Sequence, residues 1–323
     1  MNGYYVIKQD GKILSISKNV ITNEGKKLIA QNLSTLYNSW AGEIAIGAGT
    51  STPLVSNTSL DFEYGRDVVR SISSAPLVPS SYIGSSTGGT IRLIAKATLN
   101  PDVSGTIYET GLFSNYGSSN PYDTPFFYTT ATEGWSYKST ATAWGDLIDV
   151  SGGFSTTGRA GSDQIDLSKV TTVSNKKTLR YQYNANLSYI QPTDLIKLAV
   201  VTSATANTGA TAATVRFYTD DSSYYTYQYT LTSIIYPGFN ILSATKSNWT
   251  SGGTGNPSWD TINYIDVECD TTSVPQCTFI DSMRVDESAV NLANVLVSRS
   301  KLVDPVTKVQ GAPLEIEYYL DVF

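Results

Sequence analysis

Two apolar runs near the start of the chain, separated by a turn signal, predict a β-hairpin. Tyr4 to Ile7 and Ile13 to Ile16 form two such runs, and Asp10-Gly11 lies between them. Asp-Gly between apolar runs favours a tight two-residue turn. We therefore expect residues 4–16 to form two antiparallel strands.

The next segment has a helical pattern. Its apolar residues recur at the spacing of one helix face over residues 23–37, namely Leu28, Ile29, Leu33, Leu36 and Tyr37. Thr22 or Asn23 is suited to cap the helix, and Glu24 favours its first turn. This pattern predicts a single helix whose apolar face packs on a sheet.

Short runs of β-branched and aromatic residues fill most of the remaining chain. Residues 43–47, 60–70, 91–99 and 107–113 are expected strands. Residues 126–285 hold about eight to ten more without a helix between them, among them 178–183, 196–201, 214–218, 224–231, 239–242, 262–267 and 278–280. This succession predicts an antiparallel β-sandwich or jelly roll.

The last run, residues 314–323, alternates strongly and must pair with an earlier strand. We infer that it closes the sheet begun in residues 1–113. The predicted fold class is therefore mainly β, with two parts. Residues 1–124 and 287–323 form a discontinuous β-rich domain with one N-terminal helix, and residues 125–286 form an inserted jelly roll.

Composition narrows the classes of function. The chain has 323 residues, no histidine, 15% charged residues and a formal net charge of −6. Without histidine, the commonest general base and every His-containing metal site are lacking, so we expect no enzyme, no catalytic residue and no cofactor. Lysine and arginine never cluster beyond a pair, which argues against nucleic-acid binding. No run of about 20 apolar residues suits membrane insertion, and the first residues do not resemble a secretory signal.

Cys269 and Cys277 enclose a segment suited to a hairpin loop, so their thiols are expected on neighbouring strands. A disulfide and two free thiols both fit this spacing, and a reducing compartment favours the thiols. A calcium site is a separate alternative, in which Asp281 or Asp266 binds the ion together with backbone carbonyl oxygens, although no EF-hand spacing surrounds either residue.

Several segments, taken in order, resemble bacteriophage virion proteins of tails, baseplates and fibre attachments. They are the helix, the strand leading into Ile46-Gly47-Ala48-Gly49-Thr50, and a Leu-x-x-Glu-x-x-Arg segment that contains Glu63 and Arg66. A Glu-x-Gly-Leu-Phe segment with Glu109, Gly111, Leu112 and Phe113 follows, and then the C-terminal strand. The resemblance implies a structural role for Glu109, either bonding backbone in the loop after the helix or pairing with Arg66.

The inserted region looks like a carbohydrate-binding-module or galactose-binding jelly roll. Trp249, Trp259 and the segment from Phe279 to Val285 follow the order found near the end of such domains. An indole ring can stack on a sugar, so Trp249 and Trp259 are candidate glycan contacts. Packing in the core or anchoring a loop fits both residues as well, and we favour it.

These observations lead us to expect a structural component of a phage virion, of the tail, baseplate or fibre-attachment type. It would dock through the split domain and display the jelly roll outward. The alternative is a receptor-recognition or capsid decoration protein whose jelly roll contacts host-surface saccharide. The expected partners are other virion proteins, copies of the chain itself, with a trimer as one option, and host glycan. The expected location is the virion.

Overall fold

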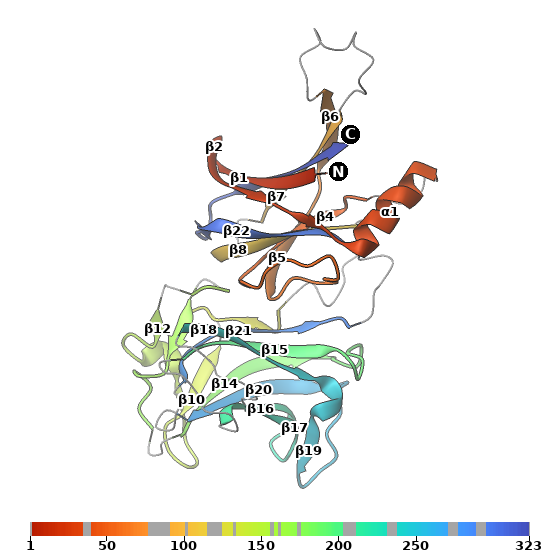
Figure 1. Cartoon of the computed structure of the whole chain (residues 1–323). Helices are drawn as coiled ribbons and strands as arrows, with labels where there is room; N and C mark the ends of the chain where they lie inside the picture. The colour runs from red at the N-terminus through yellow and green to blue at the C-terminus, as the bar shows by residue number, and fades with distance from the viewer. Residues whose placement is uncertain are drawn as a thin grey trace, which may run out of the picture. The chain divides into compact units, whose positions relative to one another are not determined.

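The computed structural model describes residues 2–34, 40–76, 91–100, 103–114, 125–131, 134–155, 158–160, 163–172, 176–202, 211–230, 238–270, 277–288 and 295–322. These residues form two compact units, which are coloured by position along the chain in Figure 1. The split unit comprises residues 1–124 and 290–323, and the insert unit comprises residues 125–289. The insert unit begins where the sequence predicts and ends at residue 289 rather than 286.

The split unit contains two five-stranded antiparallel sheets. The first has the strand order β2-β1-β23-β7-β6 and the second β3-β22-β8-β4-β5. Their bounds are β1 Asn2–Gln9, β2 Lys12–Lys18, β3 Val20–Ile21, β4 Glu43–Gly47, β5 Glu63–Val68, β6 Ser71–Pro76, β7 Ile91–Leu99, β8 Gly105–Phe113, β22 Leu296–Lys308 and β23 Leu314–Val322. The sheets lie face to face, since Tyr5 on β1 and Ser298 on β22 share a 2.7 Å hydroxyl hydrogen bond.

The first and last strands confirm two expectations. Asp10 and Gly11 both have positive φ, 50° and 74°, as the tight turn between β1 and β2 requires. The C-terminal strand β23 lies between β1 and β7 and is hydrogen-bonded to both, so it closes the first sheet. β22 runs through Pro305. The ladder with β8 is irregular between Lys301 and Val306, and a proline is tolerated at such an interruption.

Helix α1 spans Asn23–Ser34. Thr22 is its cap, because its hydroxyl oxygen accepts a 2.9 Å hydrogen bond from the Gly25 amide. The helix packs against β22, and Gly25 provides the close approach: a Cβ there would lie 2.1 Å from the carbonyl oxygen of Val297. Residues 35–37, the predicted end of the helix, lie outside the described residues.

The insert unit is a jelly roll made of two antiparallel sheets. The larger has the order β11-β10-β14-β20-β16-β17-β19, and the smaller has the order β12-β13-β21-β15-β18, with β9 also paired to β21. Their bounds are β9 Phe127–Tyr128, β10 Trp135–Lys138, β11 Trp144–Asp146, β12 Phe154–Ser155, β13 Gln164–Asp166, β14 Lys176–Ala185, β15 Leu195–Thr202, β16 Thr211–Asp220, β17 Ser223–Thr230, β18 Gly238–Thr245, β19 Thr250–Gly253, β20 Ile262–Asp270 and β21 Cys277–Asp286; two short 3-10 turns lie at Leu147–Asp149 and Lys246–Asn248.

The strand order identifies the jelly roll. When β13 to β18, β20 and β21 are numbered one to eight along the chain, one sheet reads 1-8-3-6 and the other 2-7-4-5. This is the arrangement that two interlocking Greek keys produce. Figure 1 shows β15 and β21 in one layer of the sandwich and β14, β20 and β16 in the other. Mainly β architecture with an inserted jelly roll is thus confirmed.

The jelly-roll core lies between these layers. Leu179, Phe217 and Ile265 of the larger sheet and Ile196 of the smaller are completely buried. Tyr225, Tyr227 and Tyr229 of β17 face this core, and the Tyr229 hydroxyl donates a 3.2 Å hydrogen bond to the Ile196 carbonyl of the opposite sheet. The larger sheet therefore has one buried face and one outer face.

Candidate functional site

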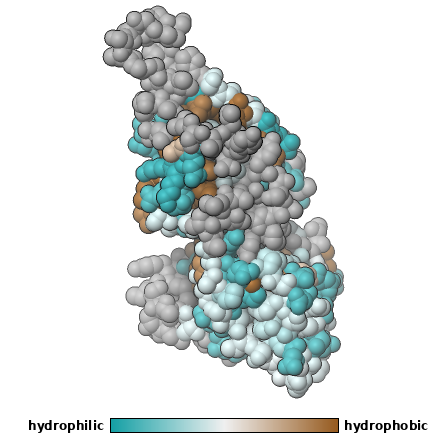
Figure 2. Space-filling view, turned by 90° about the vertical axis from the view of Figure 1, so that its right-hand side faces the viewer, coloured by the Kyte–Doolittle hydropathy of each residue, from teal (hydrophilic) through white to brown (hydrophobic). Residues whose placement is uncertain are grey.

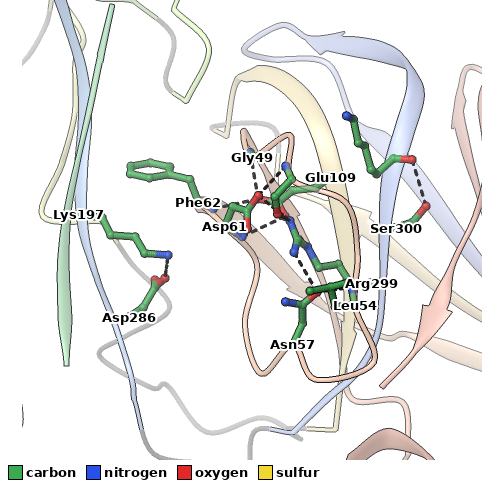
Figure 3. Close-up of polar contacts among 12 residues, drawn as sticks. Gly49, Leu54, Asn57, Asp61, Phe62, Glu109, Lys197, Asp286, Arg299 and Ser300 are labelled. Atoms are coloured by element: carbon green, nitrogen blue, oxygen red, sulfur yellow. Dashed lines mark hydrogen bonds and ion pairs between the residues drawn. The ribbon is translucent and has the colours of Figure 1, made fainter. Parts of the chain in front are cut away.

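Glu109, the first residue of the Glu-x-Gly-Leu-Phe segment, is completely buried and has a structural role. Its carboxylate accepts hydrogen bonds from three backbone amides, those of Gly49 (3.0 Å), Asp61 (3.0 Å) and Phe62 (2.9 Å) (Figure 3). It also accepts a 2.9 Å bond from the Nε of Arg299 on β22. The carboxylate therefore fastens the loop that follows β4 to two strands of the second sheet.

Arg299 is the second residue that holds this loop. It is as fully buried as Glu109, and its remaining donors reach Asn57 Oδ1 at 3.1 Å, Ser51 Oγ at 3.0 Å and Asp61 Oδ2 at 2.7 Å. All three acceptors belong to the loop between β4 and β5. The cluster satisfies buried polar groups and leaves no reactive group facing solvent, which is the pattern of a structural core.

The pairing of Glu109 with Arg66, one of the two expected alternatives, is wrong. Arg66 instead binds Glu63 through two 2.8 Å hydrogen bonds and Glu43 through one of 3.0 Å. Its guanidinium carbon also lies 3.9 Å from the ring centre of Phe113. Glu63 and Arg66 lie on one face because the ladder between β4 and β5 is irregular beside them.

The remaining residues of this segment are core. Gly111 leaves room for the side chains of Leu60 and Leu296, each of which would lie 2.9 Å from a Cβ at this position. Leu112 is completely buried, and Phe113 forms a buried cluster with Ala45, Leu60 and Leu296. The segment that resembles virion proteins thus builds the split unit and offers no ligand site of its own.

The two tryptophans proposed as glycan contacts are packing residues. Trp249 is only 7% exposed, and its ring lies 5.0 Å from that of Phe217, centre to centre. Trp259 is half-buried and stacks on Tyr225, with 4.4 Å between ring centres and 11° between planes. Because these partners face inward from the larger sheet, Trp249 packs in the core, which is the role favoured from the sequence over an exposed stacking surface.

The cysteines and acidic residues also find structural roles. Cys269 and Cys277 are buried and form no disulfide, and they lie in different sheets, so the expectation of neighbouring strands is wrong. Asp281 is completely buried and accepts backbone hydrogen bonds from Arg159 and Ala160. Among the described residues, no group of three His, Cys, Asp or Glu side chains is placed to hold a metal ion.

The outer face of the larger sheet carries a row of tyrosine rings. Tyr264 on β20, Tyr218 on β16 and Tyr224 on β17 lie opposite one another in the strand register. The ring centre of Tyr218 lies 4.7 Å from that of Tyr264 and 4.8 Å from that of Tyr224. Tyr218 and Tyr224 are half-buried, so part of each ring meets solvent. Tyr264 is only 7% exposed and supports this row from beneath Arg180, and its hydroxyl donates a 2.7 Å bond to Asp221.

A row of charged residues lies directly beside these rings. Arg180 on β14 and Arg216 on β16 are both opposite Asp266 on β20. Arg180 binds Asp266 through two hydrogen bonds of 2.7 and 2.9 Å, and Arg216 binds Glu268 at 3.2 Å. Burial raises the pKa of Asp266, and the two guanidinium groups oppose that rise. The ion pairs fix both guanidinium planes.

Arg180 connects the tyrosine row to a tryptophan. Its guanidinium carbon lies 3.6 Å from the ring centre of Tyr264 and 4.2 Å from that of Trp144 on β11. We call Trp144, Arg180, Tyr264, Tyr218, Tyr224 and Arg216 the aromatic face. It combines flat rings, which pack against C–H groups, with fixed hydrogen-bond donors at their edges. Such a surface is suited to bind a polyhydroxylated ring.

The aromatic face was not predicted from sequence, although part of its signal is there. Arg216 and Tyr218 are two residues apart on one expected strand, and Tyr264 and Asp266 are two apart on another, so each pair shares a face. What the sequence lacks is the strand order, which places β20 between β14 and β16 and so brings these pairs together.

Comparison with known proteins adds little. No protein-family model matches the chain, and no curated protein matches it. One solved structure, of the infectious bursal disease virus Gx strain, aligns with this chain at 10% sequence identity and a TM-score of 0.18. The alignment covers 99% of this chain and 78% of the viral chain. A similarity this low carries no argument about fold or function. In the described part of the chain, no helix has the length and apolar character needed to cross a bilayer.

Proposed function

We propose that this chain is a non-enzymatic, carbohydrate-binding component of a phage virion. The insert unit binds a cell-surface saccharide through its aromatic face, and the split unit attaches the protein to the particle. The observation that carries the binding part is the pair of partly exposed rings of Tyr218 and Tyr224, supported by the buried Tyr264, beside the fixed guanidinium of Arg180. Fold alone does not imply such a function, so the proposal depends on this site.

The carboxylates of the face favour binding over hydrolysis. A glycosidase needs one carboxyl as general acid and a second as base or nucleophile. Asp266 is engaged by Arg180 through both of its oxygens, and Glu268 is paired with Arg216 and Lys176. Neither is left free to exchange a proton with a substrate, so we assign them to holding the arginines.

The attachment part has support from the edge strand β2. Among the described strands it pairs only with β1, and its side chains Ile13, Leu14 and Ile16 are 57%, 42% and 57% exposed. On the face that Figure 2 shows, the coloured hydrophobic residues are more prominent on the split unit than on the insert unit. An apolar sheet edge suits an added strand, and we place an extended segment of a neighbouring virion protein there. The C-terminal strand cannot serve this purpose, because β23 is central in its sheet.

The binding part is tested by presenting the purified chain to an array of bacterial surface saccharides. We expect binding that Tyr218→Ala and Tyr224→Ala each weaken by about tenfold, because each loses a stacking ring worth more than about 1 kcal/mol. Gln228→Ala is the matched control, since Gln228 is exposed on the same strand as Tyr224 but outside the aromatic face. Absence of binding to every saccharide would refute the proposal.

A further inference from the structure

A pocket opens next to the aromatic face, at the end marked by Trp144. It has a volume of about 260 Å³, and its lining includes Lys138, Lys176, Thr140, Thr178 and Glu268. Lys138 lies directly opposite Trp144 in the pairing of β10 with β11. The volume is below the range of about 300–1,000 Å³ that encloses a whole drug-sized ligand, and it suits one unit of a longer chain.

The pocket is lined by more positively charged than negatively charged side chains. Two ammonium groups, of Lys138 and Lys176, line it together with the single carboxylate of Glu268. That carboxylate is shared, because it also binds Arg216 on the neighbouring strand. Lys138 forms no ion pair with any residue in the described ranges. Its ammonium nitrogen lies 6.0 Å from the centre of the Trp144 ring, and its charge also acts on the Asp266 carboxylate, which already binds Arg180. An excess of positive charge therefore remains at this spot on a chain whose net charge is −6.

We propose that this pocket binds the anionic group of an acidic sugar, so that the saccharide recognised by the aromatic face is an acidic one. This inference rests on the proposed saccharide-binding function. A sugar stacked along the tyrosine row would place its acidic neighbour beyond Trp144, where the two ammonium groups donate to its carboxylate or sulfate. The hydroxyls of Thr140 and Thr178 supply hydrogen bonds to the ring beside it.

The test compares acidic and neutral saccharides on the full chain. Oligosaccharides bearing carboxylates, their carboxyl-reduced neutral counterparts, and sulfated oligosaccharides are titrated in parallel. We expect an acidic member to bind, reduction of its carboxyl groups to weaken binding by about tenfold or more, and added NaCl to weaken it further. Comparison of the carboxylated and sulfated arms identifies which anion the pocket takes.

Two variants test whether the lysines of this pocket cause the preference for acidic saccharides. Lys138→Gln and Lys176→Gln are each expected to weaken acidic binding by about tenfold and to leave the affinity for the reduced saccharide unchanged. Lys12→Gln, at an exposed lysine of the split unit, is the charge-matched control. Binding of neutral saccharides only, or acidic binding that is insensitive to salt and to both variants, would overturn the acidic pocket and leave the proposed function standing. Failure of all saccharides to bind would overturn both.

Discussion

At the scale of single residues, the stability of the split unit depends on buried charged groups. Glu109 and Arg299 are both completely buried and lie 190 positions apart in the chain. Each satisfies the other, and together they hold the loop between β4 and β5 through hydrogen bonds to backbone and side chains. Removing one partner leaves a buried charge unpaired, which is far more costly than the pair itself is stabilising.

Glu109→Gln is therefore expected to lower the free energy of unfolding by about 3 kcal/mol, the typical cost of breaking a buried ion pair. Urea denaturation followed by circular dichroism measures this. The control is Glu315→Gln, since the Glu315 side chain is 42% exposed and should change stability by less than about 0.5 kcal/mol. Equal effects of the two substitutions would contradict the structural role assigned to Glu109.

Glu317 makes the split unit sensitive to acid. Burial alone would raise the pKa of its carboxyl, but hydrogen bonds from Lys8 and Lys96 outweigh burial and lower the pKa to about 2. A carboxyl whose pKa is lowered on folding stabilises the fold above its unfolded value of 4.5, and that stabilisation is lost as pH falls toward 2. We expect wild type to be more stable than Glu317→Gln at pH 6 and the difference to shrink between pH 4.5 and 2. Denaturation curves across this range test it, and a constant difference would argue against the ion pairs.

At the scale of elements, helix α1 is fixed by how closely it approaches β22. Gly25 lies in the first turn of the helix, where alanine normally stabilises by about 1 kcal/mol. Here a Cβ would meet the Val297 carbonyl oxygen at 2.1 Å, and backbone cannot yield as a flexible side chain can. The close contact between the helix and β22 therefore requires glycine at this position, although glycine has a lower helix propensity than alanine.

Gly25→Ala is accordingly expected to destabilise the split unit by about 1–3 kcal/mol, the cost typical of overpacking. Thermal unfolding measures the change. Gly134→Ala serves as the control, because nothing lies within 4 Å of a Cβ at that position. An increase in stability for Gly25→Ala would show that the helix is not seated on β22 as described.

Most elements could be predicted from local pattern, while their partners could not. The Asp10-Gly11 turn, the Thr22 cap and the strand at Glu43–Gly47 follow from short-range signals, and the structure confirms them. The choice of Arg299 over Arg66 as partner of Glu109 depends on strand pairing across the whole chain. The direction in which Trp249 faces likewise depends on which strands pack over it. Residues 71–76 were missed as a strand because Ser-rich composition favours a loop.

At the scale of the molecule, one chain builds two β-sandwiches, and the second interrupts the first. The split unit is completed only by β22 and β23, which follow the insert in sequence. Both units bury ion pairs, as Glu109 with Arg299 in the split unit and Lys197 with Asp286 in the insert unit show. The insert unit in addition exposes tyrosine rings beside arginines on a sheet face. This exposed face is the reason that we propose recognition for the insert unit and attachment for the split unit.

The most direct test of this assignment is a crystal structure of the full chain with a saccharide that it binds. The proposed function predicts sugar density against the outer face of β14, β20, β16 and β17, with a ring stacked on Tyr218 or Tyr224. The acidic group of the saccharide is expected near Lys138. Density on the split unit, or on any other surface of the insert unit, would contradict the central claim.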